Sequence, residues 1–233
     1  MKYIVLIADG MEDLPNEQLA GKTPLEVAKI PNMNRLAAEG QVGLAWTIPP
    51  GFEPASDVAN LSILGYDPKE YYMGRGPLEA ANMGISLKED EVAFRCNFVT
   101  VSEDKLEDYS AGHISDTEAD VLIEALNKKL GCDEIRFYRG LTYRHLVILK
   151  ANTKRIPFST ADLVKIPCYP PHNIMGESIR DHMPKGNAGA VLTRLMDASR
   201  EILRDHEVNK VRIDLKENPA NMICCGGRGY FTG

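Results

Sequence analysis

The sequence contains no long hydrophobic run and little tryptophan, with one Trp among 233 residues. Its longest apolar stretch covers only residues 3–8 and ends at Asp9, whereas a bilayer span needs roughly 20 apolar residues. The same stretch lacks the form of a secretory signal. We therefore expect no membrane partner and a cytoplasmic location.

An excess of positive charge and paired metal-ligand motifs are also missing. There are 27 Lys and Arg against 33 Asp and Glu, with no basic block, so the net charge of −6 predicts no nucleic-acid partner. No histidines form an H-E-x-x-H motif and no cysteines form a C-x-x-C pair, which argues against a self-contained zinc site. We predict that the cysteines are buried, unpaired thiols of a reducing compartment: Cys96, Cys132, Cys168, Cys224 and Cys225.

The elements that are present indicate an ordinary globular protein, since 44% of residues are hydrophobic and 26% are charged. Residues 3–8 form a continuous β-rich run, typical of a parallel strand buried on both faces, and residues 42–48 predict a second strand. Helices are expected from Pro31 to Gly40 and from Ser56 onward. These elements predict an α/β fold with a parallel sheet.

Past about residue 85 the pattern predicts a smaller α+β unit. Its strands are expected over residues 92–101, 135–138 and 145–150. A helix is expected over residues 116–130, because Ser115 and Glu118 have the spacing of a capping box. A Pro-rich stretch at 166–172 ends this unit, and an amphipathic helix follows over about 188–206.

Two residues lie at the ends of predicted elements, at positions where metal ligands or nucleophiles can occur. Asp9 lies at the carboxyl end of the first expected strand, where a carboxylate can bind a divalent metal or cap the next turn. Ser56 begins a helix after a rigid Pro-rich loop, where a serine can cap the helix or accept a phosphoryl group as a nucleophile. Position alone leaves both pairs of alternatives open.

Basic residues suggest an anion site. Arg75 stands between two glycines, and a guanidinium suits bidentate recognition of phosphate or carboxylate. A further group could bind an anionic substrate: His113, Arg139, Arg144, His145 and His172. For each of these residues the alternative is a solvated side chain without a ligand.

Several motifs together point to a known family. One set comprises Val5-Leu6-Ile7-Ala8-Asp9-Gly10, Lys22-Thr23-Pro24-Leu25-Glu26 and Ser56-Asp57-Val58-Ala59-Asn60-Leu61. A second set comprises Gly74-Arg75-Gly76-Pro77, Phe94-Arg95-Cys96-Asn97-Phe98 and Tyr143-Arg144-His145-Leu146. In this order, and over nearly the whole chain, they resemble the cofactor-independent phosphoglycerate mutases. The archaeal-type branch, within the alkaline phosphatase superfamily, is the most similar.

The resemblance implies a partial alkaline-phosphatase-like core with a parallel sheet and an inserted domain. Residues 1–87 would form the N-terminal part of a metal-binding core. Residues 88–185 would form an inserted α+β domain that covers the substrate, and residues 186–233 would return to the core and leave it incomplete. Two divalent metal ions are implied, commonly Mn²⁺ with Mg²⁺ as the alternative, and no 2,3-bisphosphoglycerate. Asp9 matches a metal ligand, and Ser56 matches the nucleophile next to the metal.

The implied reaction interconverts 3-phosphoglycerate and 2-phosphoglycerate, as in glycolysis and gluconeogenesis. Ser56 would take the phosphoryl group, and the resulting phosphoserine would return it to the other hydroxyl of glycerate. Two cations suit this chemistry because they activate the serine and neutralise charge on the transferred group. The basic residues named above are expected to bind this small phosphorylated substrate.

The chain also departs from the family pattern. Family members continue further and carry their remaining metal ligands, an Asp-x-x-x-His element, an Asp-His pair and a later histidine, in that C-terminal part. After Asn-Pro-Ala-Asn-Met-Ile the family typically continues Trp-Leu-Trp-Gly-Gln-Gly, whereas this chain reads Cys224-Cys225-Gly226-Gly227-Arg228-Gly229. Loss of one base from the first Trp codon produces the observed residues. We therefore expect a frameshifted and truncated chain.

Two alternatives to the mutase follow from these departures. The chain could be another enzyme of the superfamily, such as a homoserine kinase-like protein or a phosphatase, because the core motifs would look the same. It could also be an inactive, truncated protein that binds anions. The sequence favours no particular oligomeric state.

Overall fold

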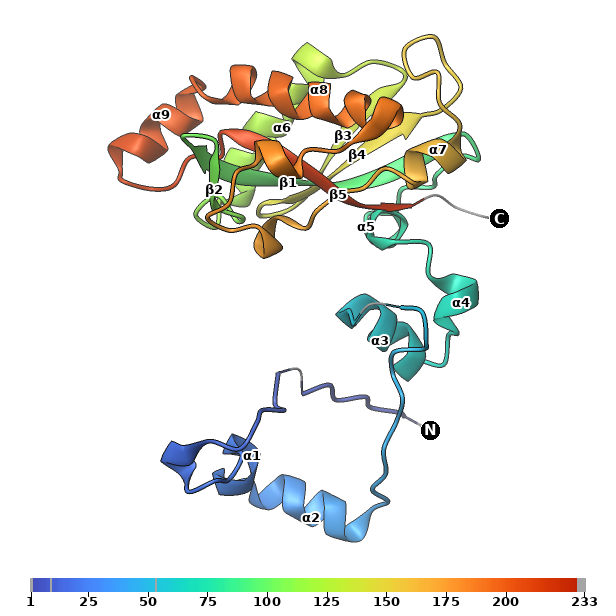
Figure 1. Ribbon diagram of the computed structural model, residues 1–233, viewed down its shortest axis with the longest axis vertical. Helices are drawn as coiled ribbons and strands as arrows, with labels where there is room; N and C mark the ends of the chain where they lie inside the picture. The colour runs from blue at the N-terminus through green and yellow to red at the C-terminus, as the bar shows by residue number, and fades with distance from the viewer. Residues whose placement is uncertain (1, 9, 53, 230–233) are drawn as a thin grey trace. The chain divides into compact units, whose positions relative to one another are not determined.

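The computed structural model describes residues 2–8, 10–52 and 54–229, and contacts divide the chain into two compact units, Met1–Pro49 and Pro50–Gly233. The described part of the first unit contains the short helices η1 (Glu17–Leu19), α1 (Pro24–Val27) and α2 (Pro31–Glu39) (Figure 1). Helix α2 begins at a proline and is followed by Gly40, as the sequence predicted.

The strands predicted over residues 3–8 and 42–48 are wrong for this structure. Residues 2–8 and 41–47 belong to no helix or strand, and their apolar side chains are exposed, with Ile4 at 91% and Trp46 at 87%. A parallel strand has no hydrogen bonds within itself, so it forms only where neighbouring strands pair with it and cover its faces. An apolar run indicates that a segment can be buried in a sheet, but it does not provide the neighbouring strands with which the segment must pair. Asp9 lies outside the described residues.

The second unit contains the sheet and most of the helices. Three helices precede the sheet: α3 (Ser56–Ile63), α4 (Pro68–Tyr71) and α5 (Arg75–Asn82). The sheet and its first helix follow: β1 (Glu91–Ser102), β2 (Lys105–Asp108), α6 (Asp116–Leu130), β3 (Ile135–Leu141) and β4 (Arg144–Lys150). The remaining elements are α7 (Thr160–Val164), η2 (Pro171–Asn173), η3 (Arg180–His182), α8 (Gly186–Leu203), α9 (Glu207–Asp214) and β5 (Met222–Gly229).

The strand order is β2-β1-β4-β3, with β5 also paired to β1. The mixed α/β class is confirmed. Every pairing between these strands is antiparallel, so the sheet differs from the parallel core expected from residues 3–8 and 42–48. Strands β1 to β4 fall in the part of the chain for which the sequence predicted an α+β unit, whereas β5 comes from beyond its predicted end at residue 185.

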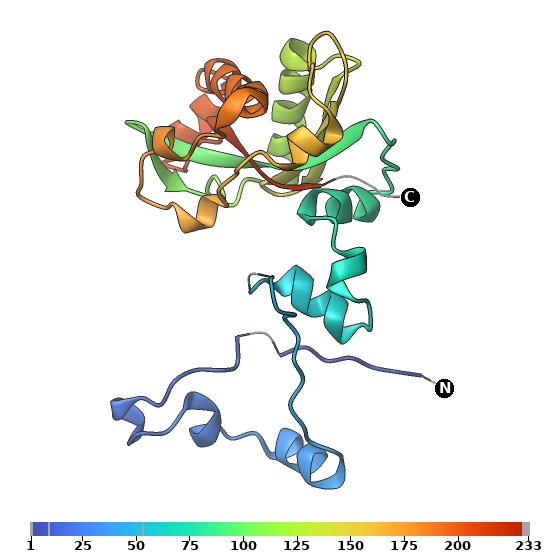
Figure 2. The same cartoon turned by 45° about the vertical axis from the view of Figure 1, so that its right-hand side comes forward.

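Alternate side chains of strand β1 point to opposite faces of the sheet, and the two faces have different surroundings. Phe94, Cys96 and Phe98 point into the main core, which α6 and α8 cover on one side of the sheet (Figure 2). The alternate residue Ala93 joins a smaller cluster beneath α5 on the other side. Helix α6 has the predicted bounds, because Ser115 and Glu118 form the capping box that the sequence indicated.

Residues 186–229 add α8, α9 and β5 to this same sheet and core. Leu192, Leu195 and Ile223 are buried with the residues of β1, and β5 pairs directly with β1. The contacts divide the chain after Pro49, whereas the sequence placed limits at 87/88 and 185/186. Those limits, and the return to a phosphatase core, stay predictions. In the described part of the chain no helix is both long and apolar enough to cross a membrane.

Candidate functional site

A cavity of about 840 Å³ opens on the face of the sheet that carries α5. Its walls come from the start of α5, from β1, β4 and β5, and from the Pro-rich segment around residues 164–172. Arg95 and Asn97 of β1 lie on its floor because they alternate with the core residues of the same strand. Small residues of β5, Cys224 and Gly226, lie beside them.

The cavity lining is strongly cationic. Among the described residues that line it, one is acidic, Glu70, and five are basic: Lys69, Arg75, Arg95, Arg144 and His172. Arg75, Arg144 and His172 were predicted from the sequence as anion-binding residues, and the structure brings them to one cavity. Converging positive charge attracts anions and raises their local concentration, so this arrangement suits a small anionic ligand.

Arg75 is held in place by an acidic residue of α3. Its Nε donates a hydrogen bond to Asp57 Oδ2 over 3.1 Å, and Tyr72 Oη donates to the same oxygen over 2.6 Å. Burial raises the pKa of Asp57, but these two hydrogen bonds outweigh it and hold its pKa below the usual value. Burial and the Asp57 contact raise the pKa of Tyr72 to about 12. The Asp57 carboxylate therefore stays ionised and fixes the guanidinium at the start of α5.

Ser56 lies next to this ion pair, but outside the cavity lining. It is the exposed first residue of α3, and Ala55 occupies the N-cap position without a side-chain cap. Capping therefore does not account for the serine in this structure. Its role as a nucleophile stays a prediction, supported by its position one residue from Asp57, the partner of the cavity residue Arg75.

Arg95 is a cavity residue that the sequence analysis did not assign. Its side chain is 18% exposed, and its Nε lies 3.7 Å from Glu79 Oε1 in a loose ion pair. Burial lowers the pKa of Arg95, Glu79 raises it, and the charges of Arg75 and Arg144 lower it further. The sequence feature that could have identified Arg95 is its place in an apolar strand, between Phe94 and Phe98. A buried arginine there needs a polar partner.

Aromatic rings form one rim of the cavity. Tyr109 packs edge to face on Tyr143 at 5.8 Å and on His172 at 6.3 Å between ring centroids. The guanidinium of Arg144 lies over the Tyr143 ring at 5.5 Å. His113 joins the same row, with its ring 6.4 Å from that of Tyr143. His113 is thus near the cavity but outside its lining.

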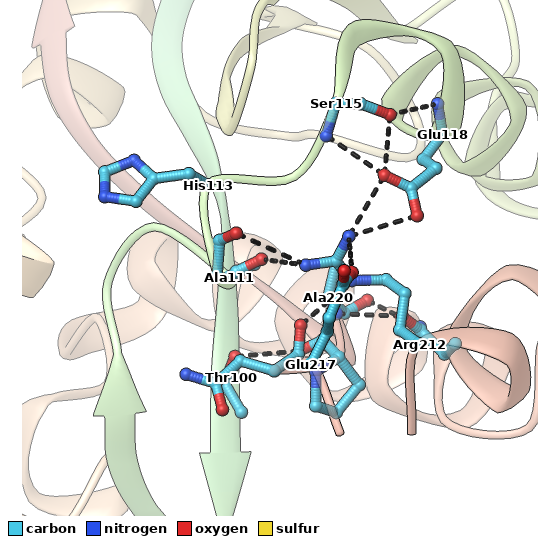
Figure 3. Close-up of polar contacts among 12 residues, drawn as sticks. Thr100, Ala111, His113, Ser115, Glu118, Arg212, Glu217 and Ala220 are labelled. Carbon is cyan, nitrogen blue, oxygen red and sulfur yellow. Dashed lines mark hydrogen bonds and ion pairs between the residues drawn. The ribbon is translucent and has the colours of Figure 1, made fainter. Parts of the chain in front are cut away.

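The backbone that carries His113 has an unusual shape, held by the polar network in Figure 3. Ala111, Gly112 and His113 have φ values of 49°, 63° and 50°, so three consecutive residues are left-handed. A Cβ on Gly112 would lie 2.8 Å from Arg212 Nη2, so the close approach also requires glycine. Left-handed conformations cost energy in other residues, and such runs persist only where surrounding contacts enforce them.

Arg212 and Asp108 supply those contacts. The Arg212 guanidinium is 3% exposed; its Nη2 donates to the Ala111 carbonyl over 2.9 Å, and its Nη1 donates to Glu118 over 3.0 Å (Figure 3). Asp108 accepts hydrogen bonds from the backbone N–H groups of Ser110 and Gly112, both over 2.7 Å. Burial raises the pKa of Asp108, but hydrogen bonds, including one from Asn218, lower it to about 2.

Two predicted substrate residues lie elsewhere. His145 is 1% exposed, its ring packs on Phe98 at 4.6 Å on the core side of the sheet, and its Nδ1 accepts the Gly140 N–H over 3.1 Å. Burial, with the charge of Arg139, lowers the pKa of His145 to about 3. Arg139 is 43% exposed and pairs with Asp120 over 2.5 Å. The structure gives both residues structural contacts and does not bring them to the cavity.

The described residues provide no cluster of further metal ligands beside Asp9 and Ser56, the two ligands predicted from the sequence. Ranges 2–8, 10–52 and 54–229 hold no group of three or more His, Cys, Asp or Glu side chains placed to bind a metal ion. Asp9, the predicted first ligand, falls outside these ranges. A two-metal site needs more ligands than Asp9 and Ser56, so the described residues do not fit one.

Comparison with known proteins identifies similar sequences over nearly the whole chain. A family model described as 2,3-bisphosphoglycerate-independent phosphoglycerate mutase matches residues 37–209. The mutase of that name from Methanosarcina acetivorans is 48% identical over 99% of this chain and 56% of its own length. A probable mutase of the same kind from Geobacter sulfurreducens is 46% identical over 98% of this chain. The chain spans a little over half the length of these relatives.

Two solved structures share the fold over a similar extent. The cofactor-independent phosphoglycerate mutase of Thermoplasma acidophilum has a TM-score of 0.55 and 30% identity, and covers 95% of this chain and 57% of its own. The PH0037 protein of Pyrococcus horikoshii has a TM-score of 0.63 and 28% identity, over 96% of this chain and 50% of its own.

Proposed function

Because this chain belongs to the 2,3-bisphosphoglycerate-independent phosphoglycerate mutase family, we propose that its cationic cavity binds phosphoglycerate for phosphoryl transfer at Ser56. The observation that carries the proposal is the convergence of Lys69, Arg75, Arg95 and Arg144 on one cavity. A phosphoglycerate carries a phosphate and a carboxylate, and guanidinium groups bind both in bidentate fashion.

In this proposal the residues have distinct tasks. Arg95 and Arg144 bind anionic groups of the substrate, while Asp57 fixes Arg75 and with it the start of α3, where Ser56 lies. Ser56 would accept the phosphoryl group and return it to the other hydroxyl of glycerate. Two Mn²⁺ or Mg²⁺ ions are the proposed activators of the serine, in a cytoplasmic enzyme. Their ligands beyond Asp9 and Ser56 would come from outside the described residues.

Direct binding of 3-phosphoglycerate tests the cavity. Isothermal titration with the full chain is expected to show binding that weakens with salt, because charge supplies much of the attraction. Arg144→Gln, which neutralises a cavity cation, is expected to weaken binding about tenfold, the effect of one charge-assisted hydrogen bond. Arg204→Gln is the control, since Arg204 is 58% exposed and pairs with its neighbour Asp205. Equal weakening by both changes would contradict the assignment.

Turnover is a separate measurement. Phosphorus NMR with 3-phosphoglycerate and Mn²⁺ reports the formation of 2-phosphoglycerate by the full chain and by Ser56→Ala. The proposal expects activity that Ser56→Ala abolishes with binding unchanged, because a hydroxyl nucleophile has no substitute in alanine. Activity that survives in Ser56→Ala would remove the serine from the reaction. Incubation with homoserine and ATP distinguishes a kinase from a mutase.

A second candidate function is anion binding without turnover. It is favoured by the described residues themselves, which form a cationic cavity but no group of three metal-ligand side chains. Binding of 3-phosphoglycerate with no product, with or without Mn²⁺, is the result that would select this function over the mutase.

A further inference from the structure

A second, smaller cavity lies on the side of the sheet that α6 and α8 cover, and we call it the helix groove. Its volume is about 290 Å³, and it shares no described lining residue with the cationic cavity. Apolar side chains from α6, β3, the loop after β4 and α8 form its walls: Leu130, Ile135, Ile156, Val191, Leu195 and Ala198. An apolar cavity of about 150 Å³ is already large enough to bind a benzene-sized molecule. The helix groove can therefore hold the apolar body of a small ligand.

Two arginines line the helix groove beside these walls. Arg194 lies on the same face of α8 as Val191 and Ala198, which are three and four residues away from it. Arg155 precedes Ile156 in a turn that fixes its backbone, because the Thr153 N–H donates to the Ile156 carbonyl and the Ile156 N–H donates to Thr153 Oγ1, both over 3.0 Å. Both arginines are therefore carried by ordered backbone at the groove.

The two guanidinium groups are available to a ligand. Arg155 and Arg194 are exposed, and neither side chain makes a hydrogen bond or ion pair with another described residue. None of the described residues that line the helix groove is acidic. Their positive charge is thus not neutralised within the groove, and an anionic group can pair with it.

Apolar walls beside free positive charge limit the class of ligand. A phosphate or another small polar anion gains nothing from the walls, which offer it no hydrogen bonds. A hydrocarbon displaces water from the walls but leaves the arginines without a partner. A carboxylate with an apolar tail uses both features, since the tail is buried and the carboxylate accepts hydrogen bonds from guanidinium groups. The volume suits a tail of about eight carbon atoms.

We propose that the helix groove binds a small monocarboxylate with an apolar tail. The tail lies between α6 and α8, and Arg155 and Arg194 bind the carboxylate. The inference does not rest on the proposed function, because the two cavities lie on opposite sides of the sheet and share no described residue. It adds a second ligand of a different chemical class.

Three probes that differ in tail length or charge test the inference. Isothermal titration of the full chain with octanoate is expected to give binding at least about tenfold tighter than with butanoate, because each fully buried methylene contributes about fourfold. Octan-1-ol has the same tail and no charge, and it is expected to bind about tenfold more weakly than octanoate. The octanoate affinity is expected to fall as salt is added.

Matched variants of α8 assign the binding to the helix groove. Ala198→Phe fills the groove and is expected to abolish octanoate binding, whereas Ala190→Phe, at an exposed position of the same helix, is expected to retain it. Arg194→Gln is expected to weaken octanoate about fivefold, the effect of one exposed ion pair. Arg204→Gln is its control, because Arg204 pairs with Asp205 and does not line the groove. Circular dichroism confirms that the variants are folded.

A competition experiment separates this inference from the proposed function. Octanoate is expected to bind equally well in the presence of 3-phosphoglycerate and in Arg144→Gln, a variant of the other cavity. If either condition removes octanoate binding, the carboxylate occupies the cationic cavity and the inference is wrong.

The remaining outcomes also decide. Equal affinity for octanoate and butanoate, or for octanoate and octan-1-ol, would overturn the inference, because one of the two features of the groove would then contribute nothing. If sedimentation shows a dimer that Ala198→Phe dissociates, the groove is an interface between copies of the chain and not a carboxylate site. The wild-type measurements decide even where Ala198→Phe does not fold.

Discussion

The buried side chain of Arg212 holds together several parts of the backbone. Arg212 is 3% exposed and bonds to Glu118 at the start of α6, to the Ala111 carbonyl and, over 3.0 Å, to the Asn218 carbonyl. One side chain of α9 thereby joins α6 to the left-handed backbone of residues 111–113. The hydrogen bonds and ion pair of Arg212 offset the energy that the left-handed backbone conformation costs.

Replacement of Arg212 is expected to destabilise the fold. Arg212→Leu leaves several carbonyl and carboxylate groups without their donor, and loss of one partner from a buried charged network costs about 3 kcal/mol. Urea unfolding followed by circular dichroism measures the loss. Arg204→Leu is the control because its guanidinium is largely exposed, and the expected change there is below about 0.5 kcal/mol. Similar midpoints for the two variants would show that the network contributes little.

The buried His145 predicts a specific pH dependence of stability. Its pKa is about 3 in the folded protein against 6.5 for an unperturbed histidine. Below pH 6.5 the unfolded chain therefore binds a proton that the folded protein does not, and the free energy of unfolding falls as pH falls. The slope due to this residue is about 1.4 kcal/mol per pH unit between pH 6 and pH 4.

The variant His145→Asn separates this effect from other titrating groups. An asparagine Oδ1 can accept the Gly140 N–H as Nδ1 does, and it does not titrate. Urea unfolding at pH 7, 6, 5 and 4 is expected to show a shallower decline for the variant than for the wild-type chain. Parallel declines would mean that His145 titrates normally in the folded protein.

The residues of the site show what the sequence can and cannot predict. Arg75, Arg144 and His172 stood out because glycines, a tyrosine and prolines flank them, and all three reach the cavity. Arg95 was missed because its role depends on strand alternation, which places it opposite the core. His145 follows Arg144 directly, so the same alternation sends its ring to the other face.

At the scale of elements, local hydrogen bonds explain which predictions succeeded. The helix over residues 116–130 was predicted with its observed bounds, because the capping box that starts it is formed by two residues close in sequence, Ser115 and Glu118. Strand β5 was not predicted, since its Cys-Cys-Gly-Gly sequence has little β propensity and pairs with β1 from more than 120 residues away. Long-range pairing is the part of the fold that local patterns do not contain.

The capping box of α6 carries a prediction of its own. Ser115→Ala removes the hydroxyl that accepts the Glu118 N–H, and we expect a loss of about 1 kcal/mol in the free energy of unfolding. Thr117→Ala, at an exposed position in the same turn, is the matched control and is expected to change stability by less than about 0.5 kcal/mol. Differential scanning calorimetry of both variants compares the two. A loss in Thr117→Ala as large as in Ser115→Ala would contradict the capping role.

At the scale of the whole molecule, the two units differ in how completely they are packed. The unit Pro50–Gly233 encloses the main core, from Val92 in β1 to Cys225 in β5. The apolar side chains of residues 3–7 and 42–46 in the other unit are exposed, with Leu44 entirely so. Apolar burial is the main source of stability, so the second unit holds most of the folding free energy.

A fragment comprising residues 50–233 is therefore expected to fold alone. Its thermal midpoint is expected within a few degrees of that of the full chain, because the deleted residues add little apolar burial. Calorimetry of both proteins measures the midpoints, and limited proteolysis is expected to cut the full chain first within residues 41–49. A fragment without a cooperative transition would show that the N-terminal residues are needed for the core to form.

Strand β1 places side chains of the main core and charged side chains of the cavity one residue apart. Phe94, Cys96 and Phe98 fill the core while Arg95 and Asn97 line the cavity. Insertion or loss of one residue would exchange the two sets and send a guanidinium into the core. Natural variation in the length of this strand should then occur in steps of two, or be absorbed by a bulge like the one already present between Thr100 and Val101. The evolutionary freedom of the cavity is thus limited to exchange of side chains and to length changes that preserve the alternation of the strand.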